Sequence, residues 1–141
     1  MIEQIATSFV ASAGFALLFN VPGRHLGYCG LVGMLGWMIY SSLLQLPADP
    51  ILATLTAAFA VTVISQLLAK VCKTPIIVFS VSGIVPLVPG GIAFEAMRNV
   101  VENHYDMAVQ RAFEAFTLSG AIAFGLVFSE VINQAIRRTR L

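Results

Sequence analysis

Three charged side chains in this chain are placed where they could move protons or open and close a passage. Glu95 and Arg98 are three residues apart, so they share one face of a helix and can form an ion pair. Glu130 follows the uncharged run 115–129. Acidic side chains at membrane depth are costly and often take part in proton relays. We expect coupling or gating roles for all three; the alternatives are an ion pair at the outer surface and, for Glu130, a structural partner for a basic residue.

A second group of residues, PLVPGG at 86–91, interrupts an otherwise apolar segment. Proline lacks an N–H and clashes with the preceding helical turn, and glycine is flexible, so this run predicts a broken helix. The N–H groups that start the next helix carry partial positive charge and bind anions such as carboxylates. We therefore predict a substrate-binding segment formed by Pro86, Pro89, Gly90, Gly91 and Ile92. The alternative is a proline kink that serves packing alone.

Other kinds of chemistry find no support in the sequence. It contains no evident Ser–His–Asp set, phosphate loop or metal-ligand spacing, and His25 and His104 fall on opposite sides of the topology described below. We expect no enzyme activity, no cofactor and no metal. The net charge of +1 gives no electrostatic case for nucleic acid. Cys29 and Cys72 are expected to be unpaired.

The composition predicts an integral membrane protein built from helices. Of the 141 residues, 58% are hydrophobic and 11% are charged, and the mean hydropathy is +0.88. Soluble domains average about 25% charged residues. The apolar windows are long and do not alternate, which is typical of transmembrane helices rather than barrel strands.

These windows predict one all-α transmembrane domain over 1–141 with five crossings. The predicted helices cover about 2–19, 27–46, 51–69, 76–102 (broken at 86–91) and 107–138. The first loop contains Arg24 and His25, and the third runs from Lys70 to Lys73. Thr74 is predicted to cap the next helix, with Pro75 at its first position.

Small residues on the predicted helices indicate close helix–helix contacts. Ser8, Ser12 and Ala16 share one face, and Gly27, Gly30, Gly33 and Gly36 recur every three residues. Such faces let membrane helices approach closely. Gln66 is costly to leave in lipid and is expected to face protein, whereas Trp37 and Tyr40 are expected at the membrane interface.

The depth of the break and the orientation of the chain follow from simple geometry. Ten residues, 76–85, rise about 15 Å, half of a roughly 30 Å hydrocarbon core, so the break falls near the midplane. One side holds Arg24, Lys70, Lys73, Arg137, Arg138 and Arg140. Because basic loops stay in the cytoplasm, we expect the N-terminus outside, the C-terminus inside, and a fourth segment that crosses rather than looping back.

Two stretches resemble a known family. GFALLFNVPGRHL at 14–26 and VSGIVPLVPGGIAFEAM at 81–97 are similar to the threonine/serine exporter family, in its split two-gene form. The match is to the small subunit, which corresponds to the C-terminal five-helix half of the single-chain exporter. The matching motif residues are Asn20, Pro22, Pro86, Pro89 and Gly90. The resemblance implies a bacterial inner-membrane protein and an inverted repeat with the substrate site at the interface of the two halves.

The resemblance also implies a function and a partner. The expected function is a membrane subunit of a secondary exporter for small carboxylate-bearing metabolites, first threonine and serine, driven by the proton gradient. The expected partner is a larger subunit with five helices and a soluble N-terminal domain, or a second copy of this chain. Asn20 is expected at the inner mouth. The alternatives are a dicarboxylate (succinate-like) exporter subunit and a non-transporting membrane scaffold.

Overall fold

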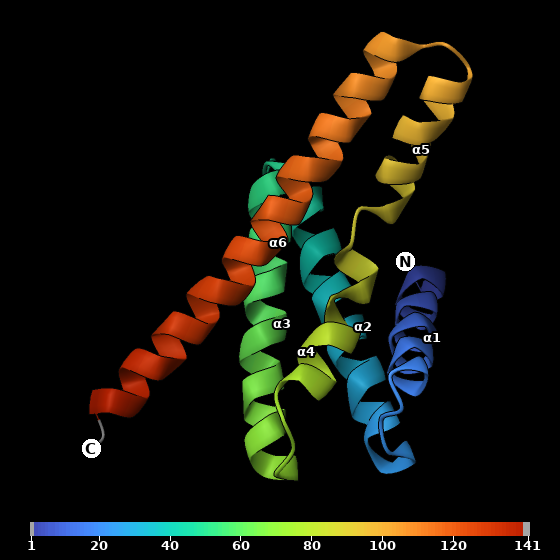
Figure 1. The fold of residues 1–141 in the computed structure, drawn as a ribbon. Helices are drawn as coiled ribbons and strands as arrows, with labels where there is room; N and C mark the ends of the chain where they lie inside the picture. Colours follow the sequence, from blue (N-terminus) through green and yellow to red (C-terminus); the bar gives the residue numbers. More distant parts are fainter. Residues whose placement is uncertain (1, 140–141) are drawn as a thin grey trace.

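Helices account for the whole architecture of the computed structural model, which describes residues 2–139 (Figure 1). In chain order the elements are α1 (Ile2–Leu18), α2 (Gly23–Gln45), α3 (Pro50–Cys72), α4 (Ile77–Ile84), the 3-10 turn η1 (Val85–Leu87), α5 (Gly90–Val101) and α6 (Tyr105–Thr139). No strand is present within this range. The prediction of an all-α chain is therefore confirmed.

Three of these helices, α2, α3 and α6, are long and apolar enough to cross a membrane. The segments Ile77–Leu87 and Gly90–Val101 pass the same test only as a pair, with a 50° bend between them. Helix α1 has 17 residues, about 26 Å of rise, which is near the lower limit for a span. Three or four crossings are thus supported by length and composition, and the fifth stays a prediction.

The prediction placed Arg24 and His25 in a loop, and this was wrong. Helix α2 begins at Gly23, and the His25 N–H donates to the carbonyl of Pro22 at 2.8 Å. The fixed φ of proline suits the start of a helix, so α2 begins four residues earlier than its apolar pattern indicated. The His25 side chain is buried and meets the ring of Phe79 edge-on, with centroids 6.0 Å apart.

The predicted third loop also differs from the structure. Helix α3 continues to Cys72 and ends at Lys73, whose left-handed φ of 52° stops the helix. Thr74 does not cap the next helix, because α4 begins at Ile77 and its capping position is Ile76, without a side-chain hydrogen bond. The Thr74 hydroxyl is buried and has no partner among residues 2–139.

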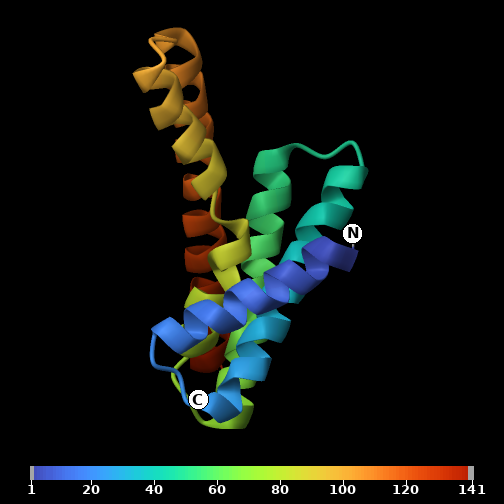
Figure 2. The same cartoon turned by 90° about the vertical axis from the view of Figure 1, so that its right-hand side faces the viewer.

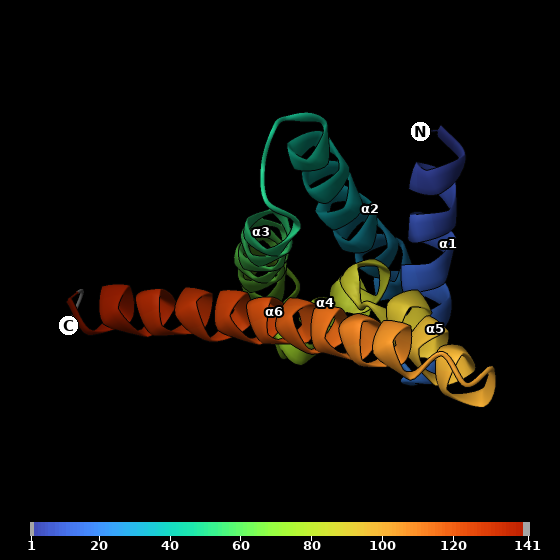
Figure 3. The same ribbon diagram turned by 90° about the horizontal axis from the view of Figure 1, so that it is seen from above.

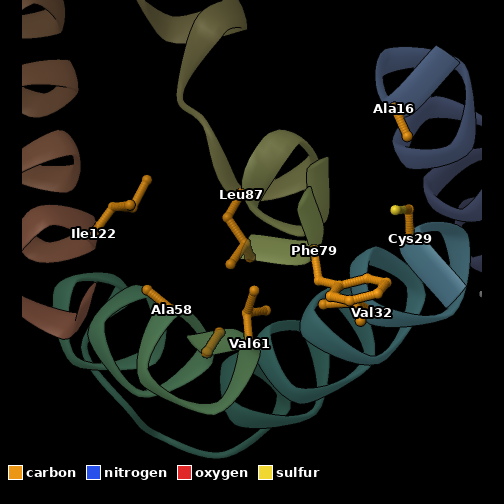
Figure 4. Close-up of a cluster of buried hydrophobic side chains, with 9 residues drawn as sticks. Ala16, Cys29, Val32, Ala58, Val61, Phe79, Leu87 and Ile122 are labelled. Carbon is orange, nitrogen blue, oxygen red and sulfur yellow. The ribbon is translucent and has the colours of Figure 1, made fainter. Parts of the chain in front are cut away.

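The hydrophobic core lies where α2, α3 and α4 meet (Figure 4). Phe79 from α4, Val32 from α2 and Val61 from α3 are fully buried there. Leu87 reaches this cluster from η1, and Ile122 reaches it from α6. The core therefore holds the end of α4 in a fixed position beside the break.

Close contacts at the small residues build this core. Ser8, Ser12 and Ala16 are buried, as predicted. A Cβ at Gly33 would lie 1.8 Å from Ser12 Oγ, and one at Gly36 would lie 2.5 Å from Val61 Cγ2. Gly30 is similarly close to the ring of Phe9, whereas Gly27 meets nothing within 4 Å. The predicted packing role is confirmed for three of the four glycines.

The remaining helices, α5 and α6, form a hairpin that projects beyond the other helices (Figure 2). Helix α6 packs along α3, and α1 and α2 lie on the opposite side of α4 (Figure 3). At Gly125 an added Cβ would lie 2.7 Å from the carbonyl oxygen of Leu55, so α6 touches the backbone of α3 there. This contact sets the position of α6 relative to the break.

Candidate substrate site at the helix break

The predicted break is present between α4 and α5. Pro86 has no N–H to continue the helical ladder, and the chain tightens into η1, which ends as the Val88 N–H donates to the Val85 carbonyl at 3.3 Å. Val88 is extended, with φ −65° and ψ 128°, and Pro89 precedes the first residue of α5. Two half-helices therefore meet at an angle around residues 85–90.

The first turn of α5 leaves two backbone donors open. The Gly90 N–H is occupied, because it donates to the Val88 carbonyl at 2.8 Å. The Ala93 N–H donates to the Pro89 carbonyl at 3.1 Å, which is the first bond of the helix. No acceptor is found for the N–H groups of Gly91 and Ile92 within residues 2–139. Of the three N–H groups at the predicted site, Gly90, Gly91 and Ile92, only the last two are therefore free to bind an anion. They are open because the first turn of a helix contains no acceptors for its own N–H groups.

A cavity of about 240 Å³ adjoins these donors. Its lining comes from α2, α3, α6 and the break: Trp37, Tyr40, Thr54, Leu118, Pro86, Leu87, Val88, Pro89, Gly91 and Ile92. Four of the five residues predicted at the break line this cavity, and Gly90 does not. The wall combines apolar surface with a few polar groups, which is the usual make-up of a small-molecule site.

Sequence reasoning did not assign the other walls of this cavity. Trp37 and Tyr40 lie against each other, with ring centroids 5.4 Å apart, and line the cavity, and their expected place at the membrane interface stays a prediction. One sequence signal could have placed them there. Trp37 and Tyr40 are three residues apart on α2, and they follow Gly33 and Gly36, which lie close to Pro86 and Leu87. Thr54 and Leu118 carry no such signal, because only the packing of α3 and α6 places them here.

Pro86 and Trp37 also line a second cavity of about 240 Å³, toward α1. Its other walls are Gln4, Thr7, Ser8 and Ala11. Pro86 and Trp37 therefore line two cavities, one bounded by α1 and the other by α3 and α6. The break separates two small spaces rather than facing solid protein on both sides.

The predicted pair of Glu95 and Arg98 does not form. Arg98 Nε lies 2.9 Å from Glu102 Oε1, and Glu95 Oε2 lies 3.3 Å from Arg111 Nε. Arg111 also contacts Glu114 at 2.9 Å. The hairpin places α6 opposite Glu95, and this tertiary contact decides the partner. Neither Glu95 nor Arg98 lines the break cavity, so a gating role for either would act through the hairpin.

Glu130 occupies a different region, between α3 and α6. Its Oε2 accepts from Gln66 Nε2 at 3.3 Å, and its Oε1 accepts from Gln134 Nε2 at 3.3 Å. Gln66 is buried and also reaches the Ser129 carbonyl at 3.4 Å, so the prediction that Gln66 faces protein is confirmed. Within residues 2–139 no basic side chain pairs with Glu130. Each carboxylate oxygen of Glu130 can therefore accept a further hydrogen bond between α3 and α6.

Asn20 is distant from the break in the chain and takes part in ending α1. Its φ of 59° is left-handed, its N–H donates to Leu17, and the Val21 N–H donates to Ala16 at 3.0 Å. This pair of bonds is a Schellman motif, in which asparagine is second only to glycine at the left-handed position. The side chain is exposed and lines neither cavity at the break.

Comparison with known proteins decides the family. The sequence profile described as Threonine/Serine exporter, ThrE matches residues 4–132. The chain belongs to the threonine/serine exporter family. Apolar helices together with membership in this family describe a multi-pass membrane protein. Membership in an exporter family is consistent with the expectation that the chain is not an enzyme.

One curated relative of this exporter-family chain is an uncharacterized protein of Haemophilus influenzae, 30% identical over 125 residues. The match covers 83% of this chain and 42% of the relative, so the chain spans less than half of that protein's length. No solved structure matches the chain.

Proposed function

We propose that this chain is the membrane subunit of a secondary exporter for small carboxylate-bearing metabolites, with threonine and serine as the first candidates. The observation that carries the proposal is the pair of open N–H groups on Gly91 and Ile92, at a cavity beside a broken helix. Discontinuous helices form substrate sites in secondary transporters, because their freed backbone groups can contact the substrate.

The chemistry of the cavity suits a small amino acid. A helix N-terminus carries about half a positive charge, and it would meet the substrate carboxylate at Gly91 and Ile92. Tyr40 and Thr54 bring hydroxyl groups to the same cavity, where they can contact a substrate hydroxyl. The Thr54 hydroxyl donates to the Pro50 carbonyl at 2.8 Å, which leaves its oxygen able to accept.

We propose that a larger five-helix subunit with a soluble N-terminal domain completes the transporter. The support is that the chain spans 42% of the length of its Haemophilus influenzae relative. The physical reason is that non-helical backbone at membrane depth must be covered by protein or line a watery cavity. A second copy of this chain is the other candidate for that cover.

The proposed location is the bacterial inner membrane, with the N-terminus outside and the C-terminus in the cytoplasm. The support is the distribution of basic residues. Arg24 at the start of α2 and Lys70 and Lys73 at the end of α3 lie at the same end of the fold (Figure 1). Arg137 and Arg138 belong to the last turn of α6, and Arg140 lies outside the described residues. Such clustering is typical of cytoplasmic ends.

We propose proton coupling, with Glu130 preferred over Glu95 as the residue that exchanges the proton. Glu95 is already engaged by the guanidinium of Arg111. Glu130 has only two weak amide contacts, both at 3.3 Å.

A transport assay tests the proposal directly. The chain is expressed with and without the larger subunit, and export of labelled threonine, serine and succinate is followed in the presence and absence of a proton gradient. We expect gradient-dependent threonine and serine export from the pair. Export of succinate alone would change the substrate class, and the absence of all three would favour a scaffold.

A further inference from the structure

A polar hollow lies away from the break, at the end where α3 and α6 approach the start of α4. It has a volume of about 420 Å³, and its lining includes Lys70, Lys73, Arg137, Glu130, Thr74 and Asn133. We propose that this hollow, the basic-end pocket, is a second substrate site that binds a small zwitterion, an amino acid with both of its charges. This inference rests on the proposed export of amino acids.

The charges of the basic-end pocket are arranged for a ligand that carries both signs. Lys70, Lys73 and Arg137 line it together with one carboxylate, Glu130. None of these four side chains forms an ion pair within residues 2–139. Opposite charges that share a pocket without pairing are free to meet a carboxylate on one side and an ammonium on the other.

The uncharged groups of the pocket point to the same ligand. The Thr74 hydroxyl is buried and lacks a partner among the described residues, although buried polar groups normally have one. The amides of Gln66 and Gln134 hold Glu130 from two sides at 3.3 Å, and each carboxylate oxygen keeps room for an ammonium proton. The pocket thus combines a fixed acceptor and three cations with an unpartnered hydroxyl buried in its wall.

The position of the pocket connects it to the break. Thr54 and Leu118 line the break cavity, while Gln66 and Glu130 line the basic-end pocket. On both α3 and α6 the second residue follows the first by twelve positions, a rise of about 18 Å. The two sites therefore lie one after the other along α3 and α6, with the basic-end pocket at the proposed cytoplasmic side.

Equilibrium binding separates this inference from the transport proposal. The subunit pair is placed in nanodiscs of neutral phosphatidylcholine, and binding of L-threonine and of L-lactate is measured without a gradient. Lactate has the carboxylate and hydroxyl but no ammonium. Because the break cavity also binds threonine in the proposed function, we expect Glu130→Gln to weaken one of two threonine-binding steps by about tenfold or more, the loss of one charge-assisted hydrogen bond, and to leave lactate binding unchanged. Lys70→Gln and Arg137→Gln should weaken both ligands.

The control is Arg138→Gln, which removes a neighbouring charge of α6 that does not line the pocket, and it should change neither ligand. The Lys70 and Arg137 variants lie at exposed helix ends and still test the pocket if Glu130→Gln fails to fold. Unchanged threonine binding in the pocket variants, with threonine export intact, overturns the inference alone. Absence of both binding and export in the unmodified pair overturns the proposed function as well.

An anionic lipid headgroup is the competing ligand for the basic-end pocket, because three cations line it. The same binding series is therefore repeated in nanodiscs that contain phosphatidylglycerol. Threonine affinity that is the same in both lipids supports the substrate site. If the anionic lipid abolishes threonine binding and Lys70→Gln restores it, the pocket holds a headgroup and the inference fails.

Discussion

Glu95 Oε2 lies 3.3 Å from Arg111 Nε, and this contact joins α5 to α6 across the projecting hairpin. Both side chains are about half exposed, at 52% and 41%. Such a pair contributes about 0–1 kcal/mol in water, so its importance lies in the register of the two helices rather than in stability.

Reversing the charges of this pair tests that register. Glu95→Arg would place two guanidinium groups opposite each other and lower the melting temperature of the purified chain slightly. Adding Arg111→Glu should restore part of the loss, because the pair re-forms with its signs exchanged while the contact of Arg111 with Glu114 is lost. Arg98→Glu meets Glu102 within α5, so Arg111→Glu should not rescue it. Equal rescue of both variants would contradict the pairing seen here.

The contact of Gly33 with Ser12 predicts a large difference between two glycines of α2. Gly33→Ala would put a methyl group 1.8 Å from Ser12 Oγ in a fully buried place and should cost about 1–3 kcal/mol. Gly27→Ala meets nothing within 4 Å and should be neutral or slightly stabilising. Thermal unfolding in detergent measures both. Ser12→Gly should recover Gly33→Ala, and failure to do so would mean that another contact limits the approach of α1.

The break offers a matched pair for export itself. A Cβ at either Gly90 or Gly91 meets no atom within 4 Å, so both alanine variants should fold. Only Gly91 lines the break cavity. We expect Gly91→Ala to reduce threonine export several-fold by filling the space beside the open donors, and Gly90→Ala to keep most of it.

The double variant Pro89→Ala with Gly91→Ala should abolish export while the protein is still inserted, because α5 could then extend toward η1 and close off the donors. Labelled-threonine efflux, normalised to membrane-inserted protein, is the measurement. Unchanged efflux in this double variant would remove the break from the substrate path.

The contact of Gly125 with α3 predicts a combined loss of stability and binding. Gly125→Ala would place a methyl group 2.7 Å from the Leu55 carbonyl oxygen, which is rigid backbone, and should cost about 1–3 kcal/mol. The separation of α3 from α6 should also weaken ligand binding at both cavities between them. Gly120→Ala is the control on the same helix, since nothing lies within 4 Å of its added Cβ. Melting temperature and threonine binding are measured together, and a loss of neither would show that α3 and α6 can move apart freely.

Much of this fold could be read from local patterns. The run of two prolines and two glycines is enough to place the break, and the three-residue spacing of Gly30, Gly33 and Gly36 is enough to predict a packed face. Both are properties of a single helix. The start of α2 was missed because Arg24 and His25 look like loop residues, although Pro22 already suits the helix start.

The partners of the charged residues could not be read in the same way. Arg98 could pair with either Glu95 or Glu102 on its own helix. It pairs with Glu102, while Arg111 of α6 pairs with Glu95. That Trp37 and Tyr40 share a cavity with Thr54 of α3 and Leu118 of α6 is likewise a result of packing between helices. Such assignments depend on tertiary packing, for which spacing in one segment carries no information.

Helix α6 is unbroken for 35 residues, about 52 Å, and its close contact with α3 at Gly125 divides it unequally. About 30 Å of helix lies between Gly125 and the hairpin turn, and about 21 Å lies between Gly125 and the basic end. Gly125 is where α6 comes within contact of the α3 backbone, so a rigid tilt of α6 would turn about this position. Such a tilt would carry the hairpin and the basic end in opposite directions, with the longer displacement at the hairpin.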